Sequence, residues 1–130
     1  LYVSGGQVTN DLSADLWAWS SGSGDGDWAL LSPSGDLPPA GRDAAIAWDP
    51  DGARVALFGG RGWYTLNGGP LELDFGASID GLGAALAPGG DLPEPVAGAS
   101  FTWCPDTASA WLVGGGALND ASTLIHELEF

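Results

Sequence analysis

The sequence predicts an all-β protein built from repeated units, and two observations support this prediction. An apolar segment that ends in a glycine pair occurs three times, at residues 1–6, 55–60 and 110–115, so the repeats start 54 and 55 residues apart. The other apolar segments are also short and bounded by turn-forming residues, and no window has the period of an amphipathic helix. A fixed period of this size indicates a repeat architecture with one supersecondary unit per repeat.

The register of the repeat extends beyond the glycine pairs. Residues 27–60 align with residues 82–115 at a constant shift of 55 and without a gap. The identical pairs include Leu31 and Leu86, Pro33 and Pro88, Gly35 and Gly90, Asp36 and Asp91, Leu37 and Leu92, Pro38 and Pro93, Trp48 and Trp103, Pro50 and Pro105, Asp51 and Asp106, and Gly59 and Gly114.

Ten short strands follow from the apolar segments and the turns between them. They are expected at residues 1–4, 16–19, 28–31, 44–48, 54–58, 71–75, 82–86, 100–103, 110–113 and 124–130. The Asp/Pro/Gly turn at 49–52 predicts a hairpin, which the segment CPDTAS repeats in the next unit. A glycine pair after a strand suits a tight turn, or a place where neighbouring units approach too closely for a Cβ. Trp48 and Trp103 share one repeat position and are expected to be core wedges between units, and Trp19, Phe75 and Phe130 are also expected in the core.

Four short strands in about 55 residues are the pattern of a β-propeller blade. Several motifs resemble the kelch repeat: the glycine pair is followed by Asp15-Leu16-Trp17 and then by a strand from Trp28 to Leu31. Residues 35–42, GDLPPAGR, resemble the linker before the innermost strand of a kelch blade, and residues 48–60 resemble a kelch hairpin. The sequence departs from the pattern where Ala97 replaces an arginine, where Gly83 replaces a tryptophan, and where the innermost strands lack the usual histidine. A regular outer strand is therefore not expected in the second unit.

The resemblance implies antiparallel blades of four strands, named a to d from the centre outward. Residues 1–40 then form strands b, c and d of one blade, residues 41–95 form a complete blade, and residues 96–130 form strands a, b and c of a third. Propellers typically close with 4–8 blades, and an open ring leaves bare strand edges. We therefore expect a segment of a larger closed ring, whose remaining blades come from the same, longer polypeptide.

The composition restricts the classes of partner. The 130 residues include 17 acidic residues, three arginines and no lysine, for a net charge of −14. Nucleic acid and anionic membranes require clustered cations, so neither is expected as a partner. No apolar run approaches the roughly 18 residues of a membrane span, so insertion into a membrane is not expected either. The acidic surface suits a cationic partner, calcium, or a high-salt or extracellular setting. We favour the interpretation that the acidic residues only keep the surface solvated. For the location of the protein, the sequence weakly favours the extracellular space or the cell surface.

No catalytic, cofactor or metal site is expected in this segment. Galactose-oxidase-like copper enzymes, which share the kelch propeller, need two histidines and two tyrosines with a linked cysteine. The chain has one histidine, His126, one cysteine, Cys104, and the tyrosines Tyr2 and Tyr64. The Asp-rich turns lack the full ligand series of a calcium loop and are attributed to turn chemistry.

The resemblance also implies where partners bind, because kelch propellers commonly contact proteins through their b–c and d–a loops. These loops correspond to residues 7–11, 61–67 and 117–120 and to residues 32–42 and 87–97. Aromatic residues beside an arginine are typical of interface anchors. The favoured function is a protein-binding or scaffolding module. The alternatives are a non-catalytic or substrate-positioning domain of an extracellular, carbohydrate-active, galactose-oxidase-like enzyme, and a structural role in surface assembly. The candidate partner-binding residues are Arg42, Arg61, Trp63, Tyr64, Asn67, Asn119 and Asp120.

Overall fold

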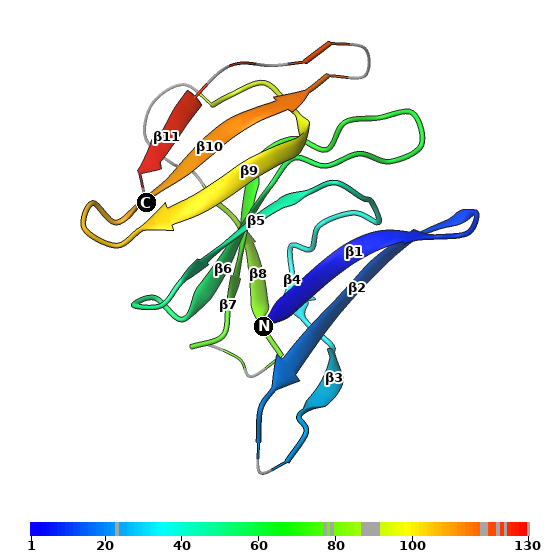
Figure 1. The fold of residues 1–130 in the computed structure, drawn as a ribbon, viewed down its shortest axis with the longest axis vertical. Coiled ribbons are helices and arrows are strands. Elements are labelled where there is room, and N and C mark those ends of the chain that lie inside the picture. The colour runs from blue at the N-terminus through cyan, green and yellow to red at the C-terminus, as the bar shows by residue number, and fades with distance from the viewer. Residues whose placement is uncertain are drawn as a thin grey trace.

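Eleven strands in three sheets make up the described part of the chain (Figure 1). The structure is a computed structural model that describes residues 1–22, 24–76, 78, 80–86, 92–117, 120–121, 123 and 125–129, and these residues form no helix. The strands are β1 (Tyr2–Val8), β2 (Asp11–Ser20), β3 (Asp27–Leu31), β4 (Ser34–Gly35), β5 (Ala45–Asp49), β6 (Arg54–Phe58), β7 (Pro70–Asp74), β8 (Leu82–Ala85), β9 (Ala97–Cys104), β10 (Ser109–Gly116) and β11 (Ile125–Glu129). The prediction of an all-β protein is confirmed.

Apart from β4, strands that follow one another in the sequence pair antiparallel within each sheet. The first sheet has the order β1-β2-β3, and the third sheet consists of β9, β10 and β11. The second sheet contains the run β5-β6-β7-β8, in which the predicted hairpin joins β5 to β6 at Asp49 and Arg54. Each of the ten predicted segments overlaps an observed strand.

The sequence did not predict β4. The position of this strand explains why the repeat departs from its pattern at Gly83. Residues Ser34 and Gly35 pair in parallel with Leu82 and Gly83, so β8 is paired on both edges. A Cβ at Gly83 would lie 2.0 Å from the carbonyl oxygen of Asp36. The tryptophan found at this position in the first unit therefore cannot be accommodated in the second, because the backbone of the preceding linker occupies the space.

The core consists of two apolar clusters, one on each side of the second sheet. Between the second and third sheets, Ala45 and Ala47 of β5 and Phe58 of β6 pack with Phe101 of β9 and Leu112 of β10. Between the first and second sheets, buried residues of β2, β6 and β7 form the other cluster, which consists of Leu16, Val55, Leu57 and Leu73. The three sheets therefore pack face against face in chain order.

The predicted core tryptophans differ in their burial. Trp103 packs against the cluster between the second and third sheets, and the Arg54 guanidinium lies 5.7 Å above its ring. Trp48 stacks on Tyr2 at 5.4 Å between ring centroids, but it remains 41% exposed, so the prediction that it is a core residue was wrong. Trp19 and Phe75 are half-buried, and Phe130 lies outside the described residues.

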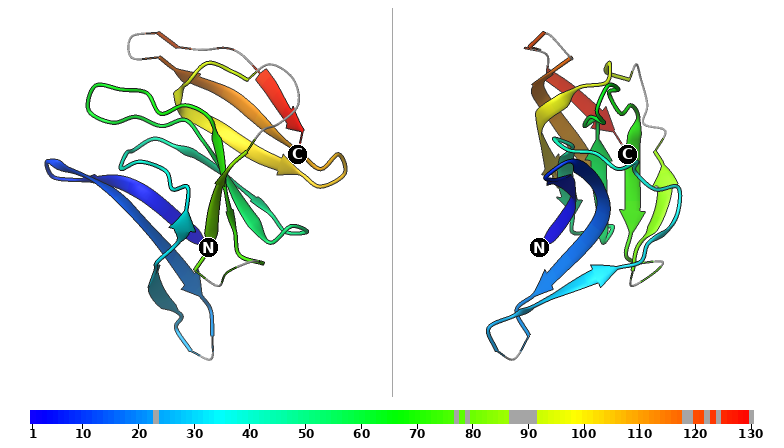
Figure 2. Two further views of the ribbon diagram at one scale, coloured as in Figure 1. Left: turned by 180° about the vertical axis from the view of Figure 1, so that it is seen from behind. Right: turned by 90° about the vertical axis from the view of Figure 1, so that its right-hand side faces the viewer.

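Turns at equivalent positions of the repeat lie at the same end of the molecule. The β1–β2 turn and the loop of residues 59–69 lie together, and the β5–β6 and β9–β10 turns lie at the opposite end (Figures 1 and 2). This arrangement brings two of the predicted partner-binding loops, residues 7–11 of the first unit and 61–67 of the second, onto one end.

Candidate functional site

The glycine pairs hold the linkers that carry the candidate site. The Gly6 amide donates to the Gly41 carbonyl at 2.7 Å, and the Gly60 amide donates to the Val96 carbonyl at 2.9 Å. Positions 41 and 96 are related by the same shift of 55 that relates the units. In both units, the glycine pair therefore anchors the linker that leads into the next inner strand, and the first of these linkers continues directly into Arg42.

The backbone of the 59–69 loop closes on itself and on this linker. Arg42 and Arg61 exchange two backbone hydrogen bonds, of 3.0 and 2.8 Å. The Asn67 amide donates to the Gly60 carbonyl at 2.8 Å, and the Gly62 amide donates to the Thr65 carbonyl at 2.9 Å. The loop is therefore fixed at its base, which leaves Trp63 and Tyr64 at its tip.

The side chains at the base of this loop form an arginine cluster, which consists of Gln7, Arg42, Asp43, Arg61 and Trp63. Arg61 Nε donates to Asp43 Oδ2 at 2.8 Å, and Arg42 Nε lies 3.9 Å from the same oxygen. Arg42 Nη1 donates to Gln7 Oε1 of the first sheet. The Arg42 guanidinium lies 5.8 Å above the Trp63 ring. Because Gln7 belongs to one unit and the other four to the next, the cluster spans two neighbouring units.

Two aromatic rings of this loop are exposed, that of Trp63 in the cluster and that of the next residue, Tyr64. Trp63 is 48% exposed and Tyr64 is 90% exposed. Large rings with a polar edge provide contact area at small entropic cost, and Arg and Trp are among the residues that most often dominate the affinity of an interface. A cleft of about 140 Å³ lies between Asp43, Arg61 and Leu66 of the second unit and residues of the third unit, which are Ala97, Gly98, Gly116 and Ala117. The surface thus combines an aromatic projection with a small cleft, which suits a protein partner.

The structure brings together some, but not all, of the predicted site residues. Arg42, Arg61 and Trp63 meet, and Tyr64 follows Trp63 in the chain, whereas the backbone of Asn67 closes the base of the loop. Asp120 lines a separate recess of about 360 Å³ near His126. Asn119 lies outside the described residues.

Two members of the cluster, Gln7 and Asp43, were not among the candidate residues named from the sequence, although Gln7 begins the predicted loop of residues 7–11. Asp43 follows the candidate residue Arg42 directly, so its position in the sequence could have identified it as an acidic member of the site. Gln7 comes from a strand 35 residues earlier in the chain, and only the packing of the first sheet against the linker brings it to Arg42.

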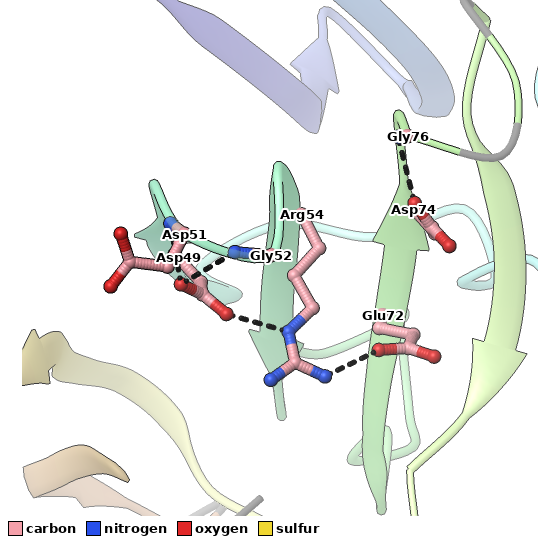
Figure 3. A network of polar contacts seen from close by, with 7 residues as sticks. All are labelled: Asp49, Asp51, Gly52, Arg54, Glu72, Asp74 and Gly76. Atoms are coloured by element: carbon pink, nitrogen blue, oxygen red, sulfur yellow. Dashed lines mark hydrogen bonds and ion pairs between the residues drawn. The ribbon is translucent and has the colours of Figure 1, made fainter. Parts of the chain in front are cut away.

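A polar network at the opposite end of the molecule explains the Asp-rich turn at 49–52 (Figure 3). Asp49 is 2% exposed and accepts hydrogen bonds from the Asp51 and Gly52 amides at 3.0 and 3.1 Å. Arg54 donates from Nε to Asp49 at 2.7 Å and from Nη1 to Glu72 at 3.2 Å. The carboxylate of Asp49 is thus used to build the turn and to hold an arginine, in agreement with the prediction of turn chemistry.

The same network makes stability depend on pH. Burial by itself raises the pKa of Asp49, but the hydrogen bonds from Arg54, Gly52 and Asp51, together with the arginine charge, hold it below its usual value. Because the folded pKa lies below the unfolded value of about 3.9, the contribution of Asp49 is present above that pH and is lost as the pH falls through the folded pKa.

We therefore predict that Asp49→Asn makes the protein less sensitive to acid. The variant will be less stable than the wild type at pH 7, and the difference between them will shrink as the pH is lowered from 5 to 2. Thermal unfolding followed by circular dichroism across this range measures the effect. Parallel curves for the two proteins would contradict it.

The described residues offer no sign of metal chemistry or of a helical membrane span. Among them, no three histidine, cysteine, aspartate or glutamate side chains lie together in a way that could hold a metal ion. Within the same part of the chain, there is no helix long and apolar enough to cross a membrane.

The fold and the site define an all-β repeat protein with an exposed arginine and aromatic surface at one end. No family model matches the sequence, and a search of curated proteins finds no match.

Proposed function

We propose that the chain is part of a kelch-type β-propeller and acts as a protein-binding or scaffolding module. The kelch motifs of the sequence support the choice of family. The run β5-β6-β7-β8 supports a four-stranded blade, and the flanking sheets have the strand numbers of partial blades. The repeated anchoring of linkers at Gly6 and Gly60 supports a regular succession of blades. In this proposal the remaining blades come from the same, longer polypeptide.

The observation that carries the binding function is the arginine cluster with its exposed aromatic neighbours. Two of the three cations of a chain with a net charge of −14 gather at one end, beside Trp63 and Tyr64. Arg61 is held by Asp43 and Arg42 by Gln7, so both guanidinium groups are positioned before a partner arrives. Such preorganisation reduces the entropic cost of binding.

Substitution of the exposed tryptophan tests the proposal. The immobilised protein is used to retain partners from extracts of its source, and the affinity of the purified partner is then measured by calorimetry. We expect Trp63→Ala to weaken binding by about 30-fold or more, which corresponds to the roughly 2 kcal/mol of an interface hot spot. Trp28→Ala is the matched control, because Trp28 is 50% exposed but lies on β3, away from the cluster.

The control should bind as the wild type does. If Trp63→Ala and Trp28→Ala retain the same partner with wild-type affinity, the cluster is not the binding surface. Equal losses in both variants would also contradict the proposal, because they would indicate a general effect on the fold.

A further inference from the structure

The two junctions between neighbouring units differ in the space beside their linkers. At the junction of the first and second units this space has a volume of about 30 Å³, whereas at the junction of the second and third units it is a recess of about 360 Å³. The shift of 55 relates several residues that line the two spaces, among them Pro38 and Pro93, Leu57 and Leu112, and Gly59 and Gly114. The spaces are therefore equivalent in the repeat, but of the two only the second, here called the linker recess, has the size of a small-molecule site, typically about 300–1,000 Å³.

Two positions of the linker recess carry polar residues where the equivalent positions of the smaller space are apolar. Glu94 stands in the place of Pro39, and His126 stands in the place of Leu71. The junction of the first and second units shows that apolar side chains suffice to pack this space. The carboxylate and the imidazole therefore indicate a role other than packing.

The Nε2 atom of His126 is a polar group that the fold leaves unpaired. His126 pairs with Leu112 in the third sheet, as the residue at its equivalent position pairs with Leu57 in the second. Its Nε2 atom is buried, and no described residue offers it a hydrogen bond. A buried polar atom without a partner costs stability, and native proteins contain few of them. An unpaired imidazole in the wall of a cavity is therefore a candidate contact for a ligand.

The other polar groups of the linker recess determine the charge of that ligand. Glu94 and Asp120 both line the recess and are exposed, whereas the apolar Leu112 is buried. None of the described lining residues is an arginine, and the chain contains no lysine. Carboxylates only accept hydrogen bonds, and they favour a positive charge. Because the prolines on both sides of Glu94 restrict the backbone, the segment that carries this carboxylate is held in place before a ligand arrives.

The linker recess does not depend on an open sheet edge. β8, the fourth strand of the run in the second sheet, contributes no described residue to the equivalent space. A strand paired beside β11 would therefore leave the recess as it is. The recess also does not suit a metal ion, because among the described residues no three acidic, imidazole or thiol side chains lie close enough together to hold one. An organic cation is the class of ligand that remains.

We propose that the linker recess binds an organic cation that carries an ammonium group on an apolar stem. The carboxylates of Glu94 and Asp120 attract the ammonium group, and the stem lies against Pro93 and Leu112. His126 accepts a hydrogen bond from the ammonium group after rotation about χ2, a side-chain torsion with a broad energy profile. The proposal uses only the repeat and the recess, and it does not depend on the arginine cluster.

Nuclear magnetic resonance of the imidazole ring tests the proposal on the intact chain. His126 is the only histidine of the sequence, so its ring signals report on the recess without ambiguity. Phenethylammonium is titrated at pH 8, where an imidazole is ordinarily neutral, and at physiological ionic strength, which screens general attraction to an acidic chain. We expect a saturable shift of the ring signals at millimolar concentration. 2-Phenylethanol, which lacks the charge, and methylammonium, which lacks the apolar stem, should each bind at least tenfold more weakly.

Variants of the chain locate the bound cation, with calorimetry as the measurement. Glu94→Gln should weaken the binding of phenethylammonium at least fivefold. Asp106→Asn is the matched control, because it removes the same charge from the β9–β10 turn, at the opposite end of β10 from the β10–β11 loop (Figure 1), and should leave binding unchanged. His126→Leu restores the residue of the second unit, so it should reduce affinity at least tenfold while the Tm does not fall. The comparison of the three probes on the wild-type chain does not depend on any variant.

A free amine and the lysine side chain of a partner share this chemistry. A parallel titration with Nα-acetyl-lysine amide distinguishes them. Tighter binding of phenethylammonium supports a free amine as the ligand, and tighter binding of the lysine derivative supports the lysine of a protein partner.

Three results would overturn the proposal. The first is the absence of a saturable shift with either ammonium compound at millimolar concentration. The second is equal binding of phenethylammonium and 2-phenylethanol, which would make the recess merely apolar. The third is an equal effect of Glu94→Gln and Asp106→Asn, or wild-type affinity in His126→Leu, because the cation would then bind to the acidic surface in general or at another place.

Discussion

Substitution of Gly59 by alanine is expected to lower the free energy of unfolding by about 3 kcal/mol, through combined backbone strain and overpacking. Gly59 has a φ of +69°, and a Cβ there would lie 2.0 Å from the Val96 carbonyl oxygen. That carbonyl accepts the Gly60 amide, so relief of the clash would also break the bond that anchors the linker. The loss is measured by urea unfolding.

Gly69→Ala is the matched control for this effect. Gly69 has a similar φ of +77°, but no atom lies within 4 Å of its Cβ position. The control should therefore show only the backbone cost of about 1–2 kcal/mol. If the two variants lose the same stability, the close approach of the units at Gly59 contributes nothing, and the structural role inferred for the glycine pair is wrong.

Arg54→Ala is expected to destabilise the protein by about 2–3 kcal/mol, because it leaves the buried Asp49 carboxylate with backbone partners but without a countercharge. Arg54 also bonds to Glu72 and covers the Trp103 ring, so the variant additionally loses contacts to β7 and β9. Chemical unfolding at pH 7 measures the change.

The same substitution at Arg61 provides the comparison. Arg61 also bonds to an aspartate through Nε, but its side chain and that of Asp43 are 39% and 40% exposed. An exposed pair contributes at most about 1 kcal/mol, so Arg61→Ala should be much milder. A loss at Arg61 equal to that at Arg54 would contradict the argument from burial. Partial recovery of stability in the double variant Arg54→Met and Asp49→Asn would support it, because the uncompensated charge is then removed.

Much of the proposed binding surface was accessible from local sequence. Arg61, Trp63 and Tyr64 lie within four residues of one loop, so composition identifies them together. Arg42 was identified through its linker motif, and the structure places it against Arg61 and Trp63. The contribution of Gln7 was not accessible, because it depends on how two units pack.

The sequence by itself determined the secondary structure and the period of this protein. Apolar segments, turn residues and the recurrence of the glycine pair are properties of neighbouring residues, and strand formation and turn geometry depend mainly on such local properties. The hairpin at 49–52 is an example, because the Asp49 side chain bonds to amides two and three residues ahead.

Only the tertiary structure decided how the units approach one another. The parallel pairing of Gly35 with Gly83, the exposure of Trp48 and the covered position of Phe101 all follow from contacts between residues that are distant in the chain. Trp48 and Trp103 occupy the same repeat position and were assigned the same role, yet Trp103 packs against the cluster between the second and third sheets, whereas Trp48, stacked on Tyr2, remains 41% exposed. The two tryptophans occupy aligned positions in similar local sequences. Their different burial therefore arises from the strands that lie beside them in the tertiary structure.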